Sequence, residues 1–409
     1  MSTSSANAPR MLSGVRILDF TQYLAGPTVT RMMAELGAEI IKVERAPDGD
    51  PCRLLPIIVN GRSAYFVQQN RGKKSLCLDF DKPEAIEILH DLVRKVDVVV
   101  ENYGPGVMTK KGLDYEALRA VNPRIIMASI SAFGRSGTMS HKVGYDIIAQ
   151  AFSGLMHMTG HPDRPPVFVG MGIADQGSGI HAFAALGYAL FHRERTGIGQ
   201  SVDISMVDCL FHQHELNLQA YVLTDGQYVP MRSGAHHPLI CPMGVFKGPE
   251  GYLVVLVLDR QWPAMARALG RPELGSDPHY ATGPERAKRK DEIIELIQSW
   301  MAGFPSDEAV LAVLERHRIA AAPVLSVADS LRNPYFAARD MIRKVEDPIL
   351  GTLTMPGWPL KFSEMGELPD LRAPLLGEHG EEVLKSELGL GDGDVDRLRR
   401  AGVLHTADV

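Results

Sequence analysis

The chain of 409 residues is longer than one ordinary hydrophobic core supports, so we expect two domains. Its composition, 45% hydrophobic and 22% charged, is that of a globular protein, and a net charge of −6 gives no reason to expect a nucleic acid or an anionic membrane as a partner. The four cysteines form no C-x-x-C pair, the N-terminal MSTSSANAPR has no apolar signal-peptide core, and no apolar run is long enough for a membrane span. We therefore expect a cytoplasmic protein with reduced thiols.

Residues 15–133 alternate short β-branched runs with helical stretches. The runs are VRILDFT, EIIKVE, DVVVEN and RIIMASIS, and between them lie GPTVTRMMAELG, KPEAIEILHDLVRKV and DYEALRAV. This alternation is typical of βαβ units and predicts a parallel sheet with helices on both faces. The first strand-to-helix turn reads Leu24-Ala25-Gly26-Pro27 and lacks G-x-G-x-x-G, and the chain has no P-loop, so a nicotinamide, flavin or P-loop enzyme is not expected.

The basic residues of this half follow the expected strands or lie in the next loops. If all of them face one edge of the sheet, they suit a ligand with several phosphates, although a solvated surface is the simpler interpretation of any one of them. They are Arg45, Arg71, Lys73, Lys74, Lys110 and Lys111.

One aspartate, Asp175, lies among four glycines in VGMGIADQGSGIHAF, residues 169–183. We expect a strand over PVFV before it and a helix over residues 181–194 after it. Asp is a favoured N-cap, so helix capping is the simplest interpretation. The glycines, which leave room for a ligand, and a helix N-terminus, which lowers the pKa of a carboxylate, favour a nucleophile.

The second half of the chain changes character. GVFKGPEGYLVVLVL predicts a hairpin that turns at residues 248–251, and several helices follow. We expect a large domain that begins with residues 1–233, a smaller α+β domain over 234–333, and a segment, 334–409, that returns to the large domain. The histidines show no metal-ligand spacing, so no metal site is expected.

Several segments together resemble the family III CoA-transferases, the CaiB/BaiF-like group that also contains α-methylacyl-CoA racemase. They are Gly26-Pro27 with LGAEIIKVE, ENYGPGVM, GLDYEALRAVNPRIIMASIS, GYDIIAQAFSGLM, Asp175 with its glycines, RTGIGQSVDISM and APLLGEHGEEVL. The resemblance covers nearly the whole chain in order. It implies a Rossmann-like large domain, a small domain, and two ring-like chains interlinked as a homodimer. It also implies an acyl-CoA thioester and a carboxylic acid as substrates, with no tightly bound cofactor.

The resemblance also implies roles for single residues. Asp175 is the expected nucleophile, which forms a mixed anhydride with the acyl group and releases CoA thiolate, and the backbone N–H groups of residues 176–178 are expected to stabilise the oxyanion. Lys110 stands where the formyl-CoA enzyme has Arg, which keeps the charge but loses bidentate geometry. The expected CoA contacts are Tyr23, Arg45, Lys73, Asn102, Tyr103, Lys110 and Tyr145.

Two other functions remain as alternatives. A 2-methylacyl-CoA racemase needs a second base, and the G-H-D-I-N-Y histidine of the racemases is replaced by Tyr145 here. A non-catalytic acyl-CoA-binding protein is disfavoured because Asp175 and its glycines are intact. His236 and His237 stand where the formyl-CoA enzyme has a glycine-rich loop, and they either face the acceptor acid or shape the loop. With Leu24 in place of that enzyme's glutamine, they favour an acid other than formate or oxalate.

Overall fold

The computed structural model describes residues 10–365 and 368–406, which form two compact units. Of the described residues, the larger unit contains 10–154, Val169–Glu215 and those from Ala337 to residue 406. The smaller unit contains Leu155–Phe168 and Leu216–Phe336. By this division, residues 216–233 belong with the smaller unit, although we expected them in the large domain. The domain boundaries at 233/234 and 333/334 stay a prediction.

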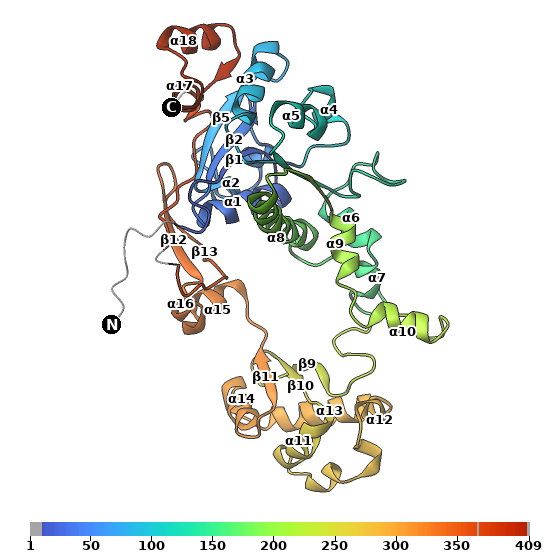
Figure 1. The fold of residues 1–409 in the computed structure, drawn as a ribbon. Helices are drawn as coiled ribbons and strands as arrows, with labels where there is room; N and C mark the ends of the chain where they lie inside the picture. Colours follow the sequence, from blue (N-terminus) through green and yellow to red (C-terminus); the bar gives the residue numbers. More distant parts are fainter. Residues whose placement is uncertain (1–9, 366–367, 407–409) are drawn as a thin grey trace. The chain divides into compact units, whose positions relative to one another are not determined.

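A seven-stranded sheet forms the centre of the larger unit (Figure 1). The strand order is β14-β5-β2-β1-β6-β7-β8, and all pairs are parallel except β14 with β5. Without β14 this is the order of a doubly wound nucleotide-binding sheet, so the predicted α/β class is confirmed. The strands are β1 (Arg16–Phe20), β2 (Glu39–Arg45), β5 (Lys73–Leu78), β6 (Val98–Glu101), β7 (Ile126–Ser131), β8 (Ser201–Ser205) and β14 (Leu404–His405).

One core of this unit consists of buried Leu, Ile and Val side chains of the sheet and of helices α3, α5, α17 and α18; Leu89, Leu118 and Leu384 are fully buried in it. Helices α1 and α8 pack against each other elsewhere in the unit. The helices of the larger unit are α1 (Ala25–Glu35), α2 (Ala64–Asn70), α3 (Pro83–Val93), α4 (Val107–Lys110), α5 (Tyr115–Val121), α6 (Asp146–Phe152), α8 (Ile173–Thr196), α9 (Met206–His212), α17 (Gly380–Leu388) and α18 (Asp392–Arg400). Its short elements are η1 (Pro51–Leu54), β3 (Ile58–Val59), β4 (Arg62–Ser63) and the hairpin β12 (Ile342–Asp347) with β13 (Gly351–Pro356).

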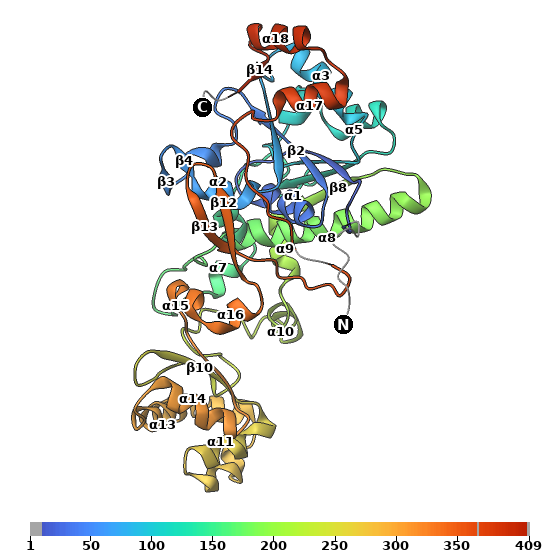
Figure 2. The same ribbon diagram turned by 90° about the vertical axis from the view of Figure 1, so that its left-hand side faces the viewer.

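Both chain ends contribute to the larger unit. In Figure 2, α17 and α18 near the C-terminus lie beside α3 from the first hundred residues. The edge strand β14 pairs antiparallel with β5, with Leu404 opposite Leu78. This unit is therefore assembled by long-range pairing.

The smaller unit is an antiparallel sheet of order β11-β10-β9 covered by helices. The predicted hairpin is confirmed, since β9 and β10 pair on either side of residues 248–251. The fully buried Phe246, Trp262 and Ile297 lie in its core. Its elements are α7 (Leu155–Met158), α10 (Asn217–Leu223), β9 (Met243–Lys247), β10 (Tyr252–Leu256), η2 (Asp259–Gln261), α11 (Trp262–Ala268), η3 (Pro272–Gly275), η4 (Pro278–Tyr280), α12 (Gly283–Ala287), α13 (Lys290–Ala302), α14 (Asp307–Arg316), β11 (Ala320–Pro323) and α15 (Val327–Arg332), with α16 (Pro334–Ala338) at the boundary.

The structure corrects two expectations around residue 175. The PVFV segment forms no strand, and the following helix begins at Ile173 rather than at His181. Among the parallel strands of the large sheet, β5 and β8 were not anticipated, because KKSLCL and SVDIS mix polar with apolar residues. In the described ranges, no helix is long and apolar enough to cross a membrane. No group of three or more His, Cys, Asp or Glu residues there is placed to hold a metal ion.

Candidate active site

The candidate site lies at the carboxyl ends of β1 and β6, where the strand order reverses. Chain segments leave this point in opposite directions, which opens a crevice for a ligand in doubly wound sheets. The two strand ends are joined by Asn102, whose Oδ1 accepts from the backbone N–H of Gln22 and whose Nδ2 donates to the Gln22 carbonyl, both at 2.8 Å. Asn102 thus fixes the strand ends that border the site, and a role as CoA contact stays a proposal.

A cavity of about 110 Å³ opens at this point, and Asp175 is one of the residues that line it. The other lining residues come from the β1–α1 turn, the loop after β6, the end of β7 and the segment before α6. They are residues 22–25, 102–105, 130–132 and 142–145, together with Met206. The parallel sheet therefore brings a single acidic side chain of α8 next to the ends of its central strands.

Asp175 does not cap its own helix. It is the third residue of α8, after the N-cap Gly172. The cap is supplied by Asp146 of α6, whose Oδ1 accepts from the backbone N–H of Ala174 at 2.7 Å and from that of Asp175 at 3.2 Å. The capping interpretation of Asp175 is therefore wrong, and its carboxyl group faces the cavity.

The acidity of Asp175 also differs from the expectation. Burial, and then the neighbouring carboxylate of Asp146, raise the pKa of Asp175 to about 7. We expected the helix N-terminus to lower this pKa, but the first N–H groups of α8 point at Asp146 instead. Burial also raises the pKa of Tyr65 on α2, and Asp175 is the largest electrostatic contributor to that rise.

The remaining backbone donors of the first turn are engaged as well. The N–H of Ile173 donates to Met171 O at 2.8 Å, and the N–H of Gln176 donates to Gly172 O at 2.9 Å. The expected oxyanion donor at Gln176 is therefore already bonded, and Gly177 and Ser178 lie further inside the helix. Stabilisation of an oxyanion needs other donors.

Two of the four glycines serve packing rather than substrate access. A Cβ atom at Gly179 would lie 2.8 Å from the carbonyl oxygen of Ala25, and one at Gly172 would lie 2.7 Å from Leu24 Cδ2. These close approaches seat the start of α8 against the start of α1. At Gly170, by contrast, a Cβ atom would meet no heavy atom within 4 Å.

A second cavity, of about 680 Å³, shares Gln22, Tyr103 and Gly104 with the cavity at Asp175. Arg45 at the end of β2 and Lys111 line it. The guanidinium of Arg45 is 61% exposed and lies 3.4 Å from Asp81, to which Lys111 also pairs at 2.7 Å. The predicted Lys110 is exposed on α4, while its neighbour Lys111 is the lysine that borders this cavity.

The six basic residues do not all lie at one edge of the sheet, an arrangement that the sequence left open. Arg45 is opposite Leu78, the last residue of β5. Lys73 is the first residue of β5 and lies about 16 Å from Leu78, toward the other end of the strand. The Lys73 ammonium is buried and pairs with Asp19 at 2.9 Å, and the buried Arg71 pairs with Glu35 at 2.9 Å. This placement gives Lys73 a structural partner, and its contact with CoA stays a prediction.

The predicted tyrosines do come together. The rings of Tyr23 and Tyr145 meet edge to face with centroids 6.1 Å apart, and Tyr145 is 64% exposed. Tyr103 lines both cavities, and its carbonyl oxygen accepts from Arg135 at 2.9 Å. These aromatic groups form a wall of the cavity at Asp175.

His236 and His237 lie in the smaller unit. The ring of His236 packs against Phe246 at 4.9 Å, and His237 Nδ1 accepts from the backbone N–H groups of Leu239 and Ile240. Both histidines thus shape their own loop, and contact with an acceptor acid stays a prediction. Sequence reasoning missed Asp146 and Tyr65, because no local spacing shows that they approach a helix that starts 27 or more residues later.

Comparison with known proteins identifies the class. The family model of CoA-transferase family III matches residues 12–380. Formyl-CoA:oxalate CoA-transferase of Streptomyces coelicolor is 36% identical over 97% of this chain and 99% of its own length. Succinyl-CoA:mesaconate CoA-transferase of Haloarcula hispanica is 39% identical over 93% of this chain and 97% of its own length. The crystal structure of a CAIB/BAIF family protein from Brucella suis superposes with a TM-score of 0.81 at 34% identity, over 93% of this chain and all of that one.

The chain therefore belongs to CoA-transferase family III. The prediction of an enzyme of the CoA-transferase class, rather than a racemase, is confirmed.

Proposed function

We propose that this protein moves CoA from an acyl-CoA thioester to a carboxylic acid, with Asp175 as the covalent nucleophile. One observation carries the proposal. The carboxyl group of Asp175 lies in the cavity at the carboxyl ends of β1 and β6, and this cavity adjoins a larger one bordered by Arg45 and Lys111. A thioester needs a nucleophile at one end of its site, and the phosphates of CoA need cations at the other. Tyr23, Asn102, Tyr103 and Tyr145 lie between or beside these ends and are the proposed pantetheine contacts.

The reaction follows from this arrangement. The ionised carboxylate of Asp175 attacks the thioester carbonyl carbon, the C–S bond breaks, and CoA leaves as the thiolate with an aspartyl mixed anhydride formed. The incoming carboxylate then attacks the Asp175 carbonyl of that anhydride and expels the first acid as its carboxylate, which leaves an anhydride of Asp175 with the new acid. The returning thiolate attacks the acyl carbon of the new acid, forms its CoA thioester and frees the Asp175 carboxylate. Each stage exchanges one carboxylate or thiolate on an acyl carbon for another, so the balance requires no redox partner and no tightly bound cofactor.

We propose a dicarboxylic acid as the acceptor. Two relatives carry names that specify oxalate and mesaconate, which both have two carboxylates. Lys142 lines the cavity at Asp175 and offers a cation to the carboxylate that does not react. The apolar side chains of Leu24 and Met206 beside it leave room for a carbon chain rather than a second polar contact.

We propose that the active form is the interlinked homodimer, located in the cytoplasm. Helix α8 carries a row of exposed apolar side chains on the face opposite its buried residues: Ile180 is 52% exposed, Tyr188 77% and Phe191 59%. Uncovered apolar surface of this kind marks an interface with another chain. Light scattering after size exclusion tests the stoichiometry, and a monomer at micromolar concentration contradicts it.

The decisive test combines acyl-CoA thioesters with carboxylic acids in a matrix read by mass spectrometry. Wild-type protein should form new CoA thioesters only when an acceptor acid is present. Hydroxylamine added with an acyl-CoA should cleave the anhydride, release the acyl group as its acid and leave a hydroxamate on Asp175. Asp175→Ala should abolish both signals while CoA still binds. Transfer at the wild-type rate by Asp175→Ala, or rapid deuterium exchange at the α-carbon of a 2-methylacyl-CoA without transfer, contradicts the proposal.

A further inference from the structure

The turn between β1 and α1 is held in an unusual conformation. Tyr23 has a φ of +63°, a left-handed conformation that a bulky side chain rarely adopts. Such a conformation persists only where the surroundings impose it, and it occurs most often at functional sites. Tyr23 lines the cavity at Asp175, so what imposes its conformation bears on the reaction.

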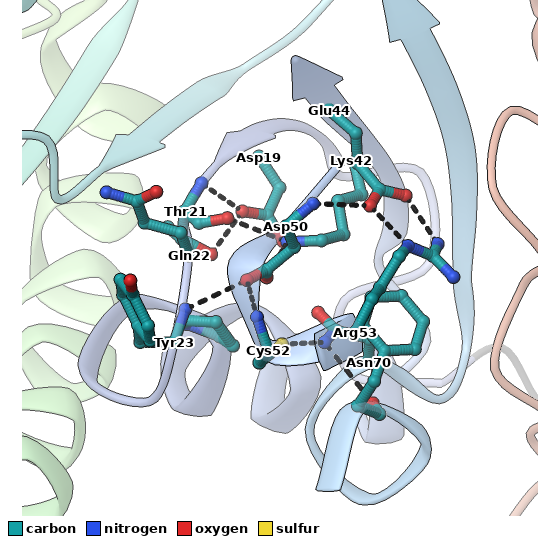
Figure 3. Close-up of polar contacts among 12 residues, drawn as sticks. Asp19, Thr21, Gln22, Tyr23, Lys42, Glu44, Asp50, Cys52, Arg53 and Asn70 are labelled. Carbon is teal, nitrogen blue, oxygen red and sulfur yellow. Dashed lines mark hydrogen bonds and ion pairs between the residues drawn. The ribbon is translucent and has the colours of Figure 1, made fainter. Parts of the chain in front are cut away.

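Three side chains from other elements hold three consecutive residues of this turn. Figure 3 shows Tyr23 beside Asp50, with Lys42 close to Asp50. The Nζ of Lys42, from β2, donates to the carbonyl oxygen of Thr21 at 2.7 Å. Asn102 bonds both backbone groups of Gln22, as described above. The backbone N–H of Tyr23 donates to Asp50 Oδ1 at 3.2 Å, so the left-handed residue itself is held by Asp50.

Asp50 is itself fixed from several sides. Its carboxylate is 1% exposed, and Oδ2 pairs at 2.8 Å with the fully buried ammonium of Lys42. Oδ1 also accepts from the backbone N–H of Cys52 at 3.0 Å, and the backbone N–H of Asp50 donates to Glu44 Oε2 at 3.0 Å. Burial alone would lower the pKa of Lys42, but Asp50, Asp19 and Glu44 together raise it, so the ammonium stays charged.

We infer that Asp50, braced by Lys42, is a positioning residue for the transfer reaction: it holds Tyr23 in the left-handed conformation that places its ring against Tyr145 beside Asp175. The inference rests on the proposed function, because it assigns a purpose to the shape of that site. The neighbouring Leu24 contacts the start of α8 at Gly172, so the same turn borders the helix that carries the nucleophile. Asp50 acts through Tyr23 and not through a bond to Asp175.

The test compares Asp50→Ala with Asp347→Ala. Asp347 is a matched control, since its buried carboxylate pairs with Arg62 at 2.8 Å and accepts two backbone N–H bonds, but in the β12–β13 hairpin. Asp50→Ala should lower kcat by about 10- to 100-fold, the usual effect of a displacement near 1 Å, and change KM for the thioester less than threefold. Asp50→Asn keeps an acceptor for the Tyr23 N–H but loses the pair with Lys42, so it should lower kcat less than Asp50→Ala does, and Asp347→Ala should leave kcat unchanged.

A Tyr23→Gly background separates positioning from general loss of structure. Glycine adopts a positive φ without strain and has no ring to place, so Asp50→Ala should cause no further loss of kcat there. An unchanged kcat in Asp50→Ala overturns the inference, and so does a loss of kcat in the Tyr23→Gly background that equals the loss in the wild-type background. Neither result affects the proposed function, as long as the wild type transfers CoA. If the wild type transfers no CoA, a crystal structure of Asp50→Ala still tests the positioning role. The role is refuted if Tyr23 keeps its positive φ and its contact with Tyr145 in that variant.

Discussion

Replacing Asp175 with Asn should stabilise the folded protein, and more strongly at high pH than at low pH. The pKa of Asp175 is raised from 3.8 to about 7 by burial and by Asp146. In the unfolded chain this carboxyl group ionises near pH 4, whereas in the folded chain it holds its proton until pH 7. Between these values the folded state binds more protons than the unfolded state, so stability falls as pH rises and is constant above pH 7.

The size of the effect follows from the same shift. One pKa unit corresponds to about 1.4 kcal/mol, so the ionisable Asp175 costs about 4 kcal/mol of folding free energy at pH 8 and about 2 kcal/mol at pH 5. Asn is a neutral group of the same shape and avoids this cost. With an unfolding entropy of about 2.1 cal/mol/K per residue, 4 kcal/mol raises the Tm of a chain of 409 residues by about 5 °C.

The assay is thermal unfolding followed by circular dichroism for wild type, Asp175→Asn and the control Asp48→Asn, which alters an exposed aspartate. The gain in Tm for Asp175→Asn should be greatest at pH 8, about half as large at pH 5, and absent for the control. The measurement needs no substrate. An equal or lower Tm at pH 8, or a gain that grows toward acid pH, refutes the reasoning that burial raises this pKa.

Three further outcomes are expected. The kcat/KM for the acyl-CoA thioester should rise with pH through a midpoint near 7, because the ionised carboxylate is the nucleophile. Asp146→Asn, which keeps an acceptor for the helix N–H groups but removes the charge, should lower that midpoint, and a midpoint that stays or rises contradicts this. Arg45→Ala should raise KM for the thioester several-fold without a change in Tm, because Arg45 is exposed. Lys73→Ala should instead destabilise the fold by about 3–5 kcal/mol, because it leaves the buried carboxylate of Asp19 without its ammonium partner. A lower Tm for Arg45→Ala, or an unchanged Tm for Lys73→Ala, contradicts this prediction. Gly179→Ala should destabilise by about 1–3 kcal/mol through its contact with α1, while Gly187→Ala, where a Cβ atom meets nothing within 4 Å, should not destabilise, as urea unfolding can show.

The sequence predicted the parts of this fold that local pattern controls. The β-branched runs become β1, β2, β6 and β7, and the glycine turn at 248–251 becomes a hairpin. Strand β5 escaped prediction because its first residues, Lys73 and Lys74, are charged, and they are buried or paired only through distant carboxylates. The nucleophile was found from its glycine context, although two of those glycines serve the contact between α1 and α8.

The acidity of the nucleophile could not be predicted from local sequence. Near Asp175 the chain indicates a helix N-terminus, and a helix N-terminus lowers the pKa of a carboxylate. The opposite result comes first from burial of the carboxyl group and then from Asp146, 29 residues earlier, which takes the first N–H groups of α8 and adds a second negative charge. Both causes arise from the packing of the folded chain and not from the local sequence.

The raised pKa has a chemical consequence for the proposed reaction. A carboxylate of pKa about 7 is more basic, and so a better nucleophile toward a thioester, than one of pKa 3.8. It is also a poorer leaving group, which biases breakdown of the anhydride toward loss of the other acid. With a pKa of about 7, the empty site holds an appreciable ionised fraction at neutral pH. Asp146 therefore contributes twice, because the same carboxylate that fixes the start of α8 also makes the Asp175 carboxylate more basic.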